Sequence, residues 1–332
     1  MAEDNDAQPP AADKPTDGRG QVPFDPEALT RVLTPLPSAG PSGRAAPPLS
    51  DYYGFYNLDF SRNVPGVEHT IGWLTSGAHQ VVVQRFEHPS PRGTAIVCHG
   101  YYDHVGLYGY LIEFLLEQAL TVVTFDQPGH GLSSGERANI GSFDEYVQAL
   151  SDVIVHYQAN LPGPWYLFGQ SMGGAIAMEY LARQEAHGFK EVVLLAPLIR
   201  PANWQLARWV YYLARYTIKE RPRNITDNAE NPEFLELQRR DPLAPMVLPV
   251  QWVTAMVEWF SGFEARSELN FEPLVVQGHA DETVDWRHTM DVLQSLTRPV
   301  YLEIPEARHH LVNESALIRQ QIFDWLQPRL RD

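Results

Sequence analysis

The sequence predicts an α/β fold, a mostly parallel twisted sheet with helices on both faces and a helical insertion. Short apolar runs of strand length alternate with helical patterns along most of the chain after residue 50, which is typical of a parallel sheet covered on both faces. A Gly-x-Ser-x-Gly stretch lies between one such run and the next helical pattern. The alternation stops near residue 201 and resumes near residue 269, which indicates an insertion over a continuous sheet.

The expected elements follow in chain order. Two strands joined at Ser76-Gly77 open the fold. Strands are expected at 67–75, 79–88, 93–98, 120–125, 165–168, 191–195, 273–277 and 300–304. Helices are expected at 108–119, at 143–158, from near Ala175, at 287–296 and at 314–326. The last helix is amphipathic, and its pattern predicts that Leu317, Ile318, Ile322 and Trp325 face inward.

The domain organisation has three parts. Residues 1–50 contain ten prolines, and we expect a disordered Pro-rich tail there. The alternative is that Leu29, Val32, Leu33 and Leu36 dock as a helical turn on the body. The core is expected at 51–200 and 269–332, and a helical lid insertion, the lid segment, at 201–268.

Composition excludes several classes of protein. The 332 residues are 44% hydrophobic, enough for a sizeable core, and the net charge of −16 with three lysines argues against a nucleic-acid partner. Cys98 is the single cysteine, so neither an intrachain disulfide nor a thiolate metal cluster is expected. No signal-peptide pattern and no apolar run of about 18 residues is present. We expect a cytoplasmic protein without metal or cofactor, with peripheral membrane contact left open.

The stretch Gly169-Gln170-Ser171-Met172-Gly173-Gly174 predicts a nucleophile elbow. An apolar strand precedes it and a helical pattern follows, so the turn would lift the Ser171 hydroxyl clear of the sheet. Glycines two residues before and after the serine avoid the clash that a positive φ at Ser171 would cause. A serine in this position is a candidate nucleophile that needs a base.

The partners of Ser171 are expected at the carboxyl ends of other strands. Asp281 follows the strand at 273–277, and the chain order Ser, acid, His of α/β-hydrolases selects it over Asp126, which is expected to cap a turn. Asp285 is better explained as a helix N-cap. The base then lies among His288, His309 and His310; His288 falls inside a predicted helix, and the two neighbours stay open at this point.

A further strand end carries His99-Gly100-Tyr101-Tyr102-Asp103-His104. Glycine there lets the backbone approach a substrate, so the amides of Tyr101 and Met172 are the expected oxyanion donors. His99 and His104 are expected to brace the loop through hydrogen bonds rather than to take part in catalysis.

Six ordered motifs resemble the monoacylglycerol lipase and bacterial lysophospholipase group of α/β-hydrolases, from about Gly93 to Trp325. They are His99-Gly100 with Asp103-His104, Asp126-x-x-Gly129-His130-Gly131-x-Ser133, Gly135-Glu136-Arg137, the elbow, Gln277-Gly278-x-x-Asp281 and Ala307-Arg308-His309-x-Leu311-x-Asn313-Glu314. The resemblance implies that His309 is the base and that the lid segment covers an acyl pocket. Tyr101 stands where the family often has a small residue.

The lid segment contains two helical patterns, one with Leu206, Trp209, Val210 and Leu213 and the other with Val253, Met256, Val257 and Phe260. Further aromatic residues make the first pattern apolar almost all round. Three alternatives explain this: its faces line a substrate tunnel, its outer face touches a membrane or lipid aggregate, or its aromatic residues are buried among lid helices.

These observations predict a serine esterase with the catalytic triad Ser171, His309 and Asp281, acting on a carboxylic ester of a fatty acyl chain through an acyl-enzyme. Monoacylglycerol or lysophospholipid is the favoured substrate class. A general short-chain carboxylesterase, an acyltransferase and a catalytically silent binding protein on the same scaffold are the alternatives. The acyl ester is the expected partner, and the oligomeric state is left undetermined.

Overall fold

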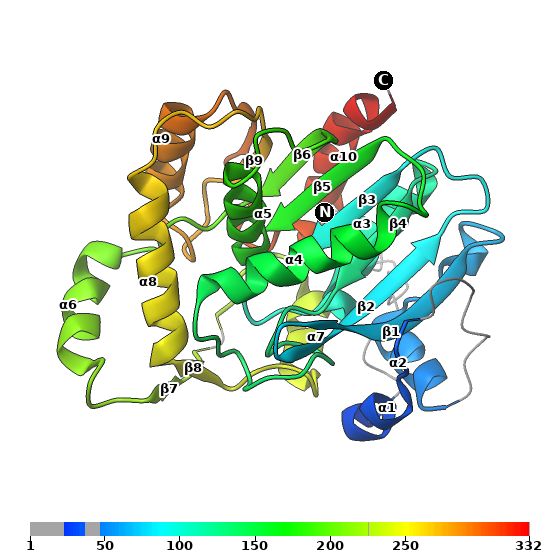
Figure 1. The fold of residues 1–332 in the computed structure, drawn as a ribbon, viewed down its shortest axis with the longest axis horizontal. Coiled ribbons are helices and arrows are strands. Elements are labelled where there is room, and N and C mark those ends of the chain that lie inside the picture. Colours follow the sequence, from blue (N-terminus) through cyan, green and yellow to red (C-terminus); the bar gives the residue numbers. More distant parts are fainter. Residues whose placement is uncertain (1–22, 37–46, 225, 332) are drawn as a thin grey trace, which may run out of the picture.

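A computed structural model describes residues 23–36, 47–224 and 226–331. Its centre is an eight-stranded sheet in the order β1-β2-β4-β3-β5-β6-β9-β10 (Figure 1). The strands are β1 (Glu68–Ser76), β2 (His79–Glu87), β3 (Thr94–Cys98), β4 (Thr121–Phe125), β5 (Trp165–Gln170), β6 (Phe189–Leu195), β9 (Leu274–Gly278) and β10 (Val300–Ile304). The first two pairings in that order, β1 with β2 and β2 with β4, are antiparallel, and the other strands are parallel. This confirms the predicted mostly parallel sheet.

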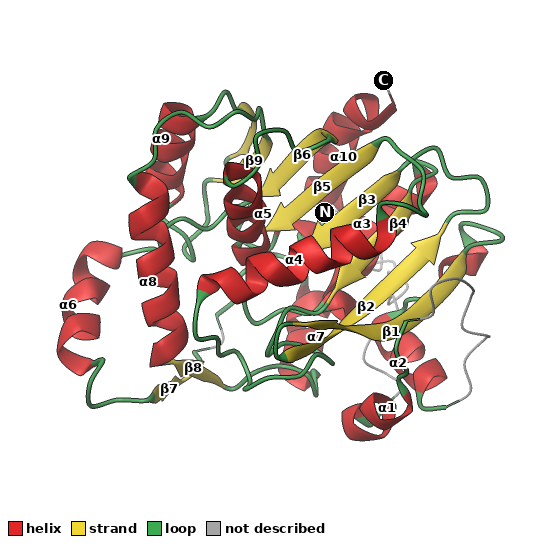
Figure 2. Cartoon of the chain, in the orientation of Figure 1, coloured by secondary structure: helices red, strands yellow, loops and turns green. Residues whose placement is uncertain are grey.

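Helices cover both faces of the sheet, as predicted (Figure 2). The helices of the two layers are α3 (Gly109–Glu117) and α10 (Ala316–Arg331) on one face, and α4 (Phe143–Tyr157), α5 (Met172–Ala182) and α9 (Trp286–Leu296) on the other. Successive residues of β3 alternate between the two cores: Val97 packs with the α3 and α10 side, and Ile96 with the α4 and α5 side. Every residue of β3 is buried, which explains why its sequence is a continuous apolar run.

Capping residues and amphipathic patterns determine where α4 begins and which face of α10 is buried. Ser142 and Glu145 form a reciprocal capping box that begins α4, within one residue of the predicted range. Ile318, Ile322 and Leu326 line the inner face of α10. The expectation that Leu317 also faces inward is wrong, because that side chain is 79% exposed. One step along a helix turns the side chain by about 100°, so Leu317 lies outside the stripe that contacts the sheet.

Part of the Pro-rich N-terminal segment is folded. Helix α1 (Pro26–Val32) is capped by Asp25, and its Leu29 is fully buried. Leu36 and Trp73 of β1 are joined by a backbone hydrogen bond of 2.9 Å. The favoured prediction of disorder is therefore wrong for residues 23–36 and for 47–50, where α2 (Leu49–Tyr56) begins. The alternative of a docked helical turn holds for Leu29, Leu33 and Leu36, which pack on the core, but not for Val32, which is 53% exposed. The prediction for residues 1–22 and 37–46 lies outside the described residues.

The segment between β6 and β9 leaves the sheet and returns to it. It contains α6 (Trp204–Ala214), β7 (Glu220–Pro222), α7 (Pro232–Arg240), β8 (Val247–Pro249) and α8 (Val250–Glu264). In Figure 1, α6 and α8 lie to one side of the sheet, beyond the end at which α5 begins. The two predicted helical patterns correspond to α6 and α8. Helix α7 was not predicted, although its Asn231 cap and its buried Phe234 and Leu237 are signals of a helix, and the short β7–β8 pairing was not predicted either. Among the described residues, no helix combines the length and apolar character that crossing a membrane requires.

Candidate active site

Ser171 stands at the turn between β5 and α5 with φ of 53° and ψ of −115°. Its amide donates to the carbonyl of Leu195 at 2.9 Å, which ties the turn to β6. A Cβ on Gly169 would lie 2.5 Å from the Gly173 carbonyl oxygen, and a Cβ on Gly173 would lie 2.1 Å from that of Cys98. Side chains are therefore sterically excluded at both positions, as the elbow prediction requires.

The structure brings Ser171, His309 and Asp281 together. The Nε2 atom of His309 lies 2.9 Å from Ser171 Oγ, and its Nδ1 lies 2.7 Å from Asp281 Oδ2. A carboxylate only accepts hydrogen bonds, so Nδ1 carries the proton, and Nε2 of the neutral ring is the acceptor for the Ser171 hydroxyl. All three residues are less than 9% exposed, and Ser171 and His309 form part of a pocket lining. The arrangement can move a proton from Oγ to Nε2.

The pKa values of His309 and Asp281 are shifted in opposite directions, and each shift favours the charged form of the residue. Burial lowers the pKa of His309, but the carboxylates of Asp281 and Asp103 raise it more strongly, so this pKa lies above its ordinary value of 6.5. Burial raises the pKa of Asp281, but His309 and the amides of Thr283 and Val284 lower it more strongly, so this pKa lies below 3.8. An ionised Asp281 beside His309 favours the positive imidazolium that proton transfer from Ser171 creates.

The loop that carries His309 is held from both ends. The side-chain amide of Gln170, beside Ser171, donates to the His309 carbonyl at 2.9 Å. Asn313 donates to the Leu107 carbonyl at 2.7 Å. The buried carboxylate of Glu314 accepts from the Arg308 amide at 2.7 Å. These bonds give a physical reason for the Asn-Glu pair that follows His309 in the sequence.

The competing candidates have other partners. Asp126 accepts from the amides of Val105 and Leu132 at 2.8 Å each, so it orders a turn as predicted. Asp285 caps α9 through the His288 amide, also as predicted. His288 lies within α9, and its Nε2 is 2.9 Å from a Glu264 carboxylate oxygen. None of these contacts is made to Ser171.

His310 faces a different carboxylate from its neighbour. Its Nε2 lies 3.0 Å from Asp103 Oδ2, away from Ser171. The same Asp103 oxygen accepts from the Tyr108 hydroxyl at 2.9 Å, and that hydroxyl accepts from the Gly100 amide at 2.8 Å. Sequence reasoning missed this link between the His310 loop and the Tyr101 loop. The Asp103-His104 motif was its only visible signal.

The peptide group between Gly100 and Tyr101 is oriented by a hydrogen bond from His99 to the Gly100 carbonyl. The amide of Gln127 donates to His99 Nε2 at 2.8 Å, so His99 Nδ1–H donates to the Gly100 carbonyl at 2.7 Å. In a trans peptide the N–H points away from the C=O, so the Tyr101 amide points to the opposite side. The bracing role predicted for His99 therefore has a specific geometry. Burial lowers the pKa of His99 to about 3, which keeps the ring neutral.

Of the two predicted oxyanion donors, Met172 follows Ser171 directly in the chain, and Tyr101 follows Gly100, which lies beside Ser171 in space. Met172 is the first residue of α5, where amides have no partner within the helix. A Cβ on Gly100 would lie 3.3 Å from the Ser171 Cβ. Within the described ranges, no backbone carbonyl accepts from the Tyr101 or Met172 amide. Both donors are therefore available to an oxygen bound beside Oγ.

His104 belongs to a buried cluster that the sequence did not reveal. Its Nε2 lies 2.7 Å from Asp241 Oδ2 at the end of α7, and Asp241 Oδ1 accepts from the Tyr56 hydroxyl at 2.6 Å. Burial lowers the pKa of His104, but Asp241 raises it more strongly, to a net value above 6.5. The cluster joins the lid segment to the Tyr101 loop and to α2 (Leu49–Tyr56). This agrees with the structural role expected for His104.

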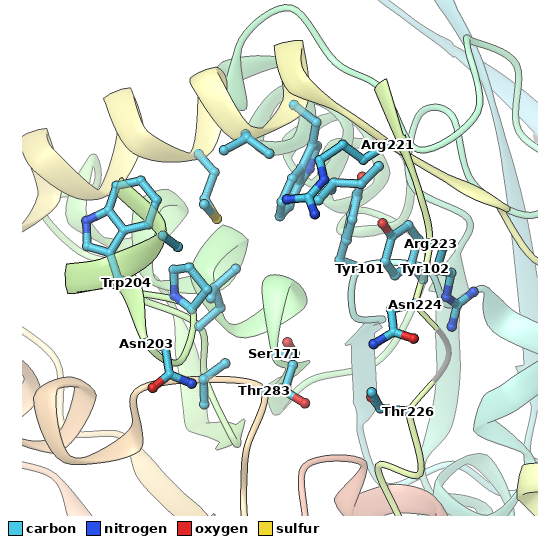
Figure 3. A pocket seen from close by; sticks show the side chains of 18 of the residues that line it. Tyr101, Tyr102, Ser171, Asn203, Trp204, Arg221, Arg223, Asn224, Thr226 and Thr283 are labelled. Atoms are coloured by element: carbon cyan, nitrogen blue, oxygen red, sulfur yellow. The ribbon is translucent and has the colours of Figure 1, made fainter. Parts of the chain in front are cut away.

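A pocket of about 590 Å³ opens above Ser171 (Figure 3). Ser171 and His309 line its floor, and α6 and α8 of the lid segment supply much of its wall. Tyr101 stacks on Trp252 of α8 with ring centroids 3.6 Å apart. The bulky residue at position 101 therefore joins the Gly100 loop to the lid segment and narrows the pocket beside Ser171. In the described parts of the chain, no group of three His, Cys, Asp or Glu side chains is arranged to hold a metal ion.

The sequence matches the serine aminopeptidase S33 family over residues 89–316. The chain belongs to this family. The matched range includes the elbow, Asp281 and His309 as well as the whole lid segment.

Several named proteins are similar to this chain over most of its length. Human monoglyceride lipase is 28% identical over 254 residues, which cover 73% of this chain and 83% of that protein. Phospholipase YtpA of Bacillus subtilis is 25% identical over 243 residues, covering 70% and 93% respectively. A soluble variant of monoglyceride lipase from Saccharomyces cerevisiae, solved with a substrate analogue, superimposes with a TM-score of 0.69 at 15% identity over 80% of this chain and 95% of that one. This S33 family member thus has the α/β-hydrolase fold and is a serine hydrolase related to monoglyceride lipases and esterases.

Proposed function

We propose that this protein hydrolyses carboxylic esters of fatty acyl chains through an acyl-enzyme, with monoacylglycerols or lysophospholipids as the substrate class. The observation that carries the proposal is the contact series from Asp281 Oδ2 to His309 Nδ1 at 2.7 Å and from Nε2 to Ser171 Oγ at 2.9 Å. The series ends at the floor of a pocket lined by apolar side chains of α6 and α8. That setting suits an acyl chain better than a small polar substrate.

In the proposed mechanism, Ser171 Oγ attacks the ester carbonyl carbon while His309 Nε2 takes its proton. The carbonyl oxygen gains negative charge, which the amides of Tyr101 and Met172 stabilise. His309 then returns the proton to the leaving alcohol, and the acyl group remains on Ser171. Water repeats the attack with His309 again as the base, which releases the fatty acid and restores Ser171. Asp281 orients His309 throughout.

The test is hydrolysis of glycerol and p-nitrophenyl esters of short and long acyl chains by the wild type and by Ser171→Ala. We expect the variant to lose at least about 10³-fold in kcat with an unchanged melting temperature. Turnover close to wild type in Ser171→Ala refutes the mechanism. A preference for acetyl over long-chain esters leaves a general esterase instead, and acyl esters formed with added acceptor alcohols indicate an acyltransferase. A folded protein that a fluorophosphonate leaves unlabelled at Ser171 is a silent binding protein.

We also propose that the outer face of α6 contacts a lipid surface. Trp209 and Leu213 of α6 are 63% and 81% exposed, and Tyr216, two residues after the helix, is 80% exposed, so the alternative of aromatic residues all buried among lid helices does not hold. Trp204 and Tyr211 of the same helix are buried and line the pocket. A helix with one face on the substrate pocket and an apolar face outward suits a substrate that is delivered from a lipid aggregate.

Vesicle binding tests this contact with two leucines of nearly equal exposure. Leu213 on α6 is 81% exposed and Leu317 on α10 is 79% exposed. Burying a leucine in lipid contributes about 1.5–3 kcal/mol, so Leu213→Ser should weaken co-sedimentation with phosphatidylcholine vesicles about tenfold or more. Leu317→Ser should leave vesicle binding unchanged. Equal losses in both variants, or in neither, contradict a specific role for α6.

A further inference from the structure

The pocket above Ser171 has two chemically different sides. Figure 3 places Trp204 on one side of Ser171, and Arg223, Asn224 and Thr226 on the other. Helices α6 and α8 add apolar residues to the same lining, among them Val210 and Met256. An ester bound with its carbonyl at Ser171 would therefore extend an apolar group in one direction and a polar group in the other.

The lining of the pocket is rich in positive charge. Arg215, Arg221 and Arg223 line the pocket, and Asp103 is the one carboxylate among its described lining residues. Asp103 already accepts from Tyr108 and lies 3.0 Å from His310 Nε2. The whole chain has 41 acidic and 25 basic residues apart from histidine. Three arginines against one carboxylate reverse that balance, so the charged side chains of the pocket lining are mainly positive although the net charge of the protein is negative.

Two of these arginines, Arg221 and Arg223, have guanidinium N–H donors that can bind a ligand. Arg223 lies over the Tyr102 ring at 4.3 Å and donates one hydrogen bond, to the Pro245 carbonyl at 3.3 Å. Arg221 lies on β7 with an exposed side chain. Neither guanidinium forms an ion pair with a carboxylate of the described residues. Arg215 differs, because it donates to the Tyr216 hydroxyl at 2.6 Å and lies over the ring of that tyrosine.

On the basis of the proposed function, we propose that Arg221 and Arg223 bind an anionic group on the alcohol part of the ester. A guanidinium presents a planar set of N–H donors that matches phosphate and carboxylate oxygens. The substrate class is then a single-chain acyl ester with an anionic head group, whose acyl chain lies toward Trp204 and whose head group lies toward Arg223. A neutral glyceride would leave both arginines without an anionic partner.

The experiment compares 1-decanoylglycerol 3-phosphate with 1-decanoylglycerol, both below their critical micelle concentrations so that no lipid surface is present. Wild type should hydrolyse the phosphate-bearing ester with the higher kcat/KM. The double variant Arg221→Gln, Arg223→Gln should lower kcat/KM for that ester about tenfold, equal to about 1.4 kcal/mol, mainly through KM. Hydrolysis of the neutral ester should stay within about twofold.

Two variants serve as controls. Arg223→Lys keeps the charge and should retain most of the preference for the phosphate-bearing ester. Arg298→Gln removes a charge at a side chain that is 77% exposed and lies outside the pocket lining, and it should change neither rate. The proposal is overturned if wild type shows no preference between the esters, or if the double variant slows both equally while its melting temperature is unchanged.

A binding measurement separates this inference from the proposed hydrolysis. Decyl phosphate and undecanoate are titrated calorimetrically into Ser171→Ala, with and without the two arginine substitutions. Binding of either anion that depends on Arg221 and Arg223 supports the inference even if no ester is hydrolysed, and the tighter ligand identifies phosphate or carboxylate as the preferred anion. Equal binding with and without the arginines overturns it, whatever the esterase assays give.

Discussion

Replacing Asp281 with asparagine should leave His309 unable to act as the base, while the loop that contains residue 281 stays folded. Asp281 Oδ1 accepts from the amides of Thr283 and Val284 at 2.8 and 3.1 Å, and the asparagine carbonyl oxygen can keep both bonds. Its NH₂ group then faces His309 Nδ1 in place of Oδ2. That group donates, so Nδ1 becomes the acceptor and the proton moves to Nε2, which faces Ser171 Oγ. In this tautomer His309 has no lone pair toward the serine.

The loss in kcat from the wrong tautomer is on the order of 10⁴-fold, or about 5 kcal/mol of barrier. The pH profile should change as well. The rate follows the unprotonated fraction of His309, so kcat/KM rises with pH through the pKa of His309, which lies above 6.5 in the wild type. Without the Asp281 charge, the lowering effect of burial gains weight, and the acid limb of the residual activity should move to lower pH.

The assay is the pH dependence of kcat/KM on a soluble ester, together with the melting temperature of each variant. Asp285→Asn is the matched control, because Asp285 caps α9 and asparagine caps helices about as well. We expect that control to keep wild-type activity within about twofold. A loss below about tenfold in Asp281→Asn, or an acid limb that stays in place or moves upward, refutes the assigned role of Asp281.

Gly173→Ala and Tyr108→Phe test the surroundings of Ser171, and Gly262→Ala is the control for the glycine substitution. Gly173→Ala should lower the free energy of unfolding by about 3 kcal/mol, because its Cβ would lie 2.1 Å from the Cys98 carbonyl oxygen. Gly262→Ala lies within α8 without a neighbour inside 4 Å and should raise the free energy of unfolding by about 0.5–1 kcal/mol. Denaturant titration of both variants measures these changes. Tyr108→Phe removes the acceptor of the Gly100 amide and a donor to Asp103. The activation barrier should rise by about 1–3 kcal/mol, which lowers kcat with little change in KM. An unchanged kcat would show that Tyr108 does not orient the loop that carries Tyr101.

Much of the site could be predicted because its signals are local. The elbow needs glycines at fixed offsets from Ser171, and those offsets are visible in the chain. Asp281 and His309 follow apolar runs of strand length, and parallel strands bring their carboxyl ends to one edge of the sheet. The choice between His309 and His310 rested on the family resemblance. In the structure, the Nε2 atoms of these adjacent residues approach different partners, Ser171 and Asp103.

Other features depend on residues that are far apart in the chain. His104 and Asp241 are 137 positions apart, and no periodicity links them. The composition of residues 1–50 favours disorder, yet Leu29 is buried because a core surface happens to lie beside α1. Arg221 and Arg223 stand in a short stretch between two helices and resemble any solvated pair of charges. The structure places both in the lining of the pocket that contains Ser171.

The sequence by itself determined the alternating strands and helices of the core, the elbow, the candidate acid, and the pair His309 and His310 as candidate bases, because each depends on residue spacing and on the chain order of a parallel sheet. Only the tertiary structure decided that Ser171 and His309, 138 residues apart, lie 2.9 Å from one another. It also decided which face of α6 meets the pocket and which stays exposed. Such contacts depend on how distant elements pack, and a helix that is apolar nearly all round carries no local signal of which face will be covered.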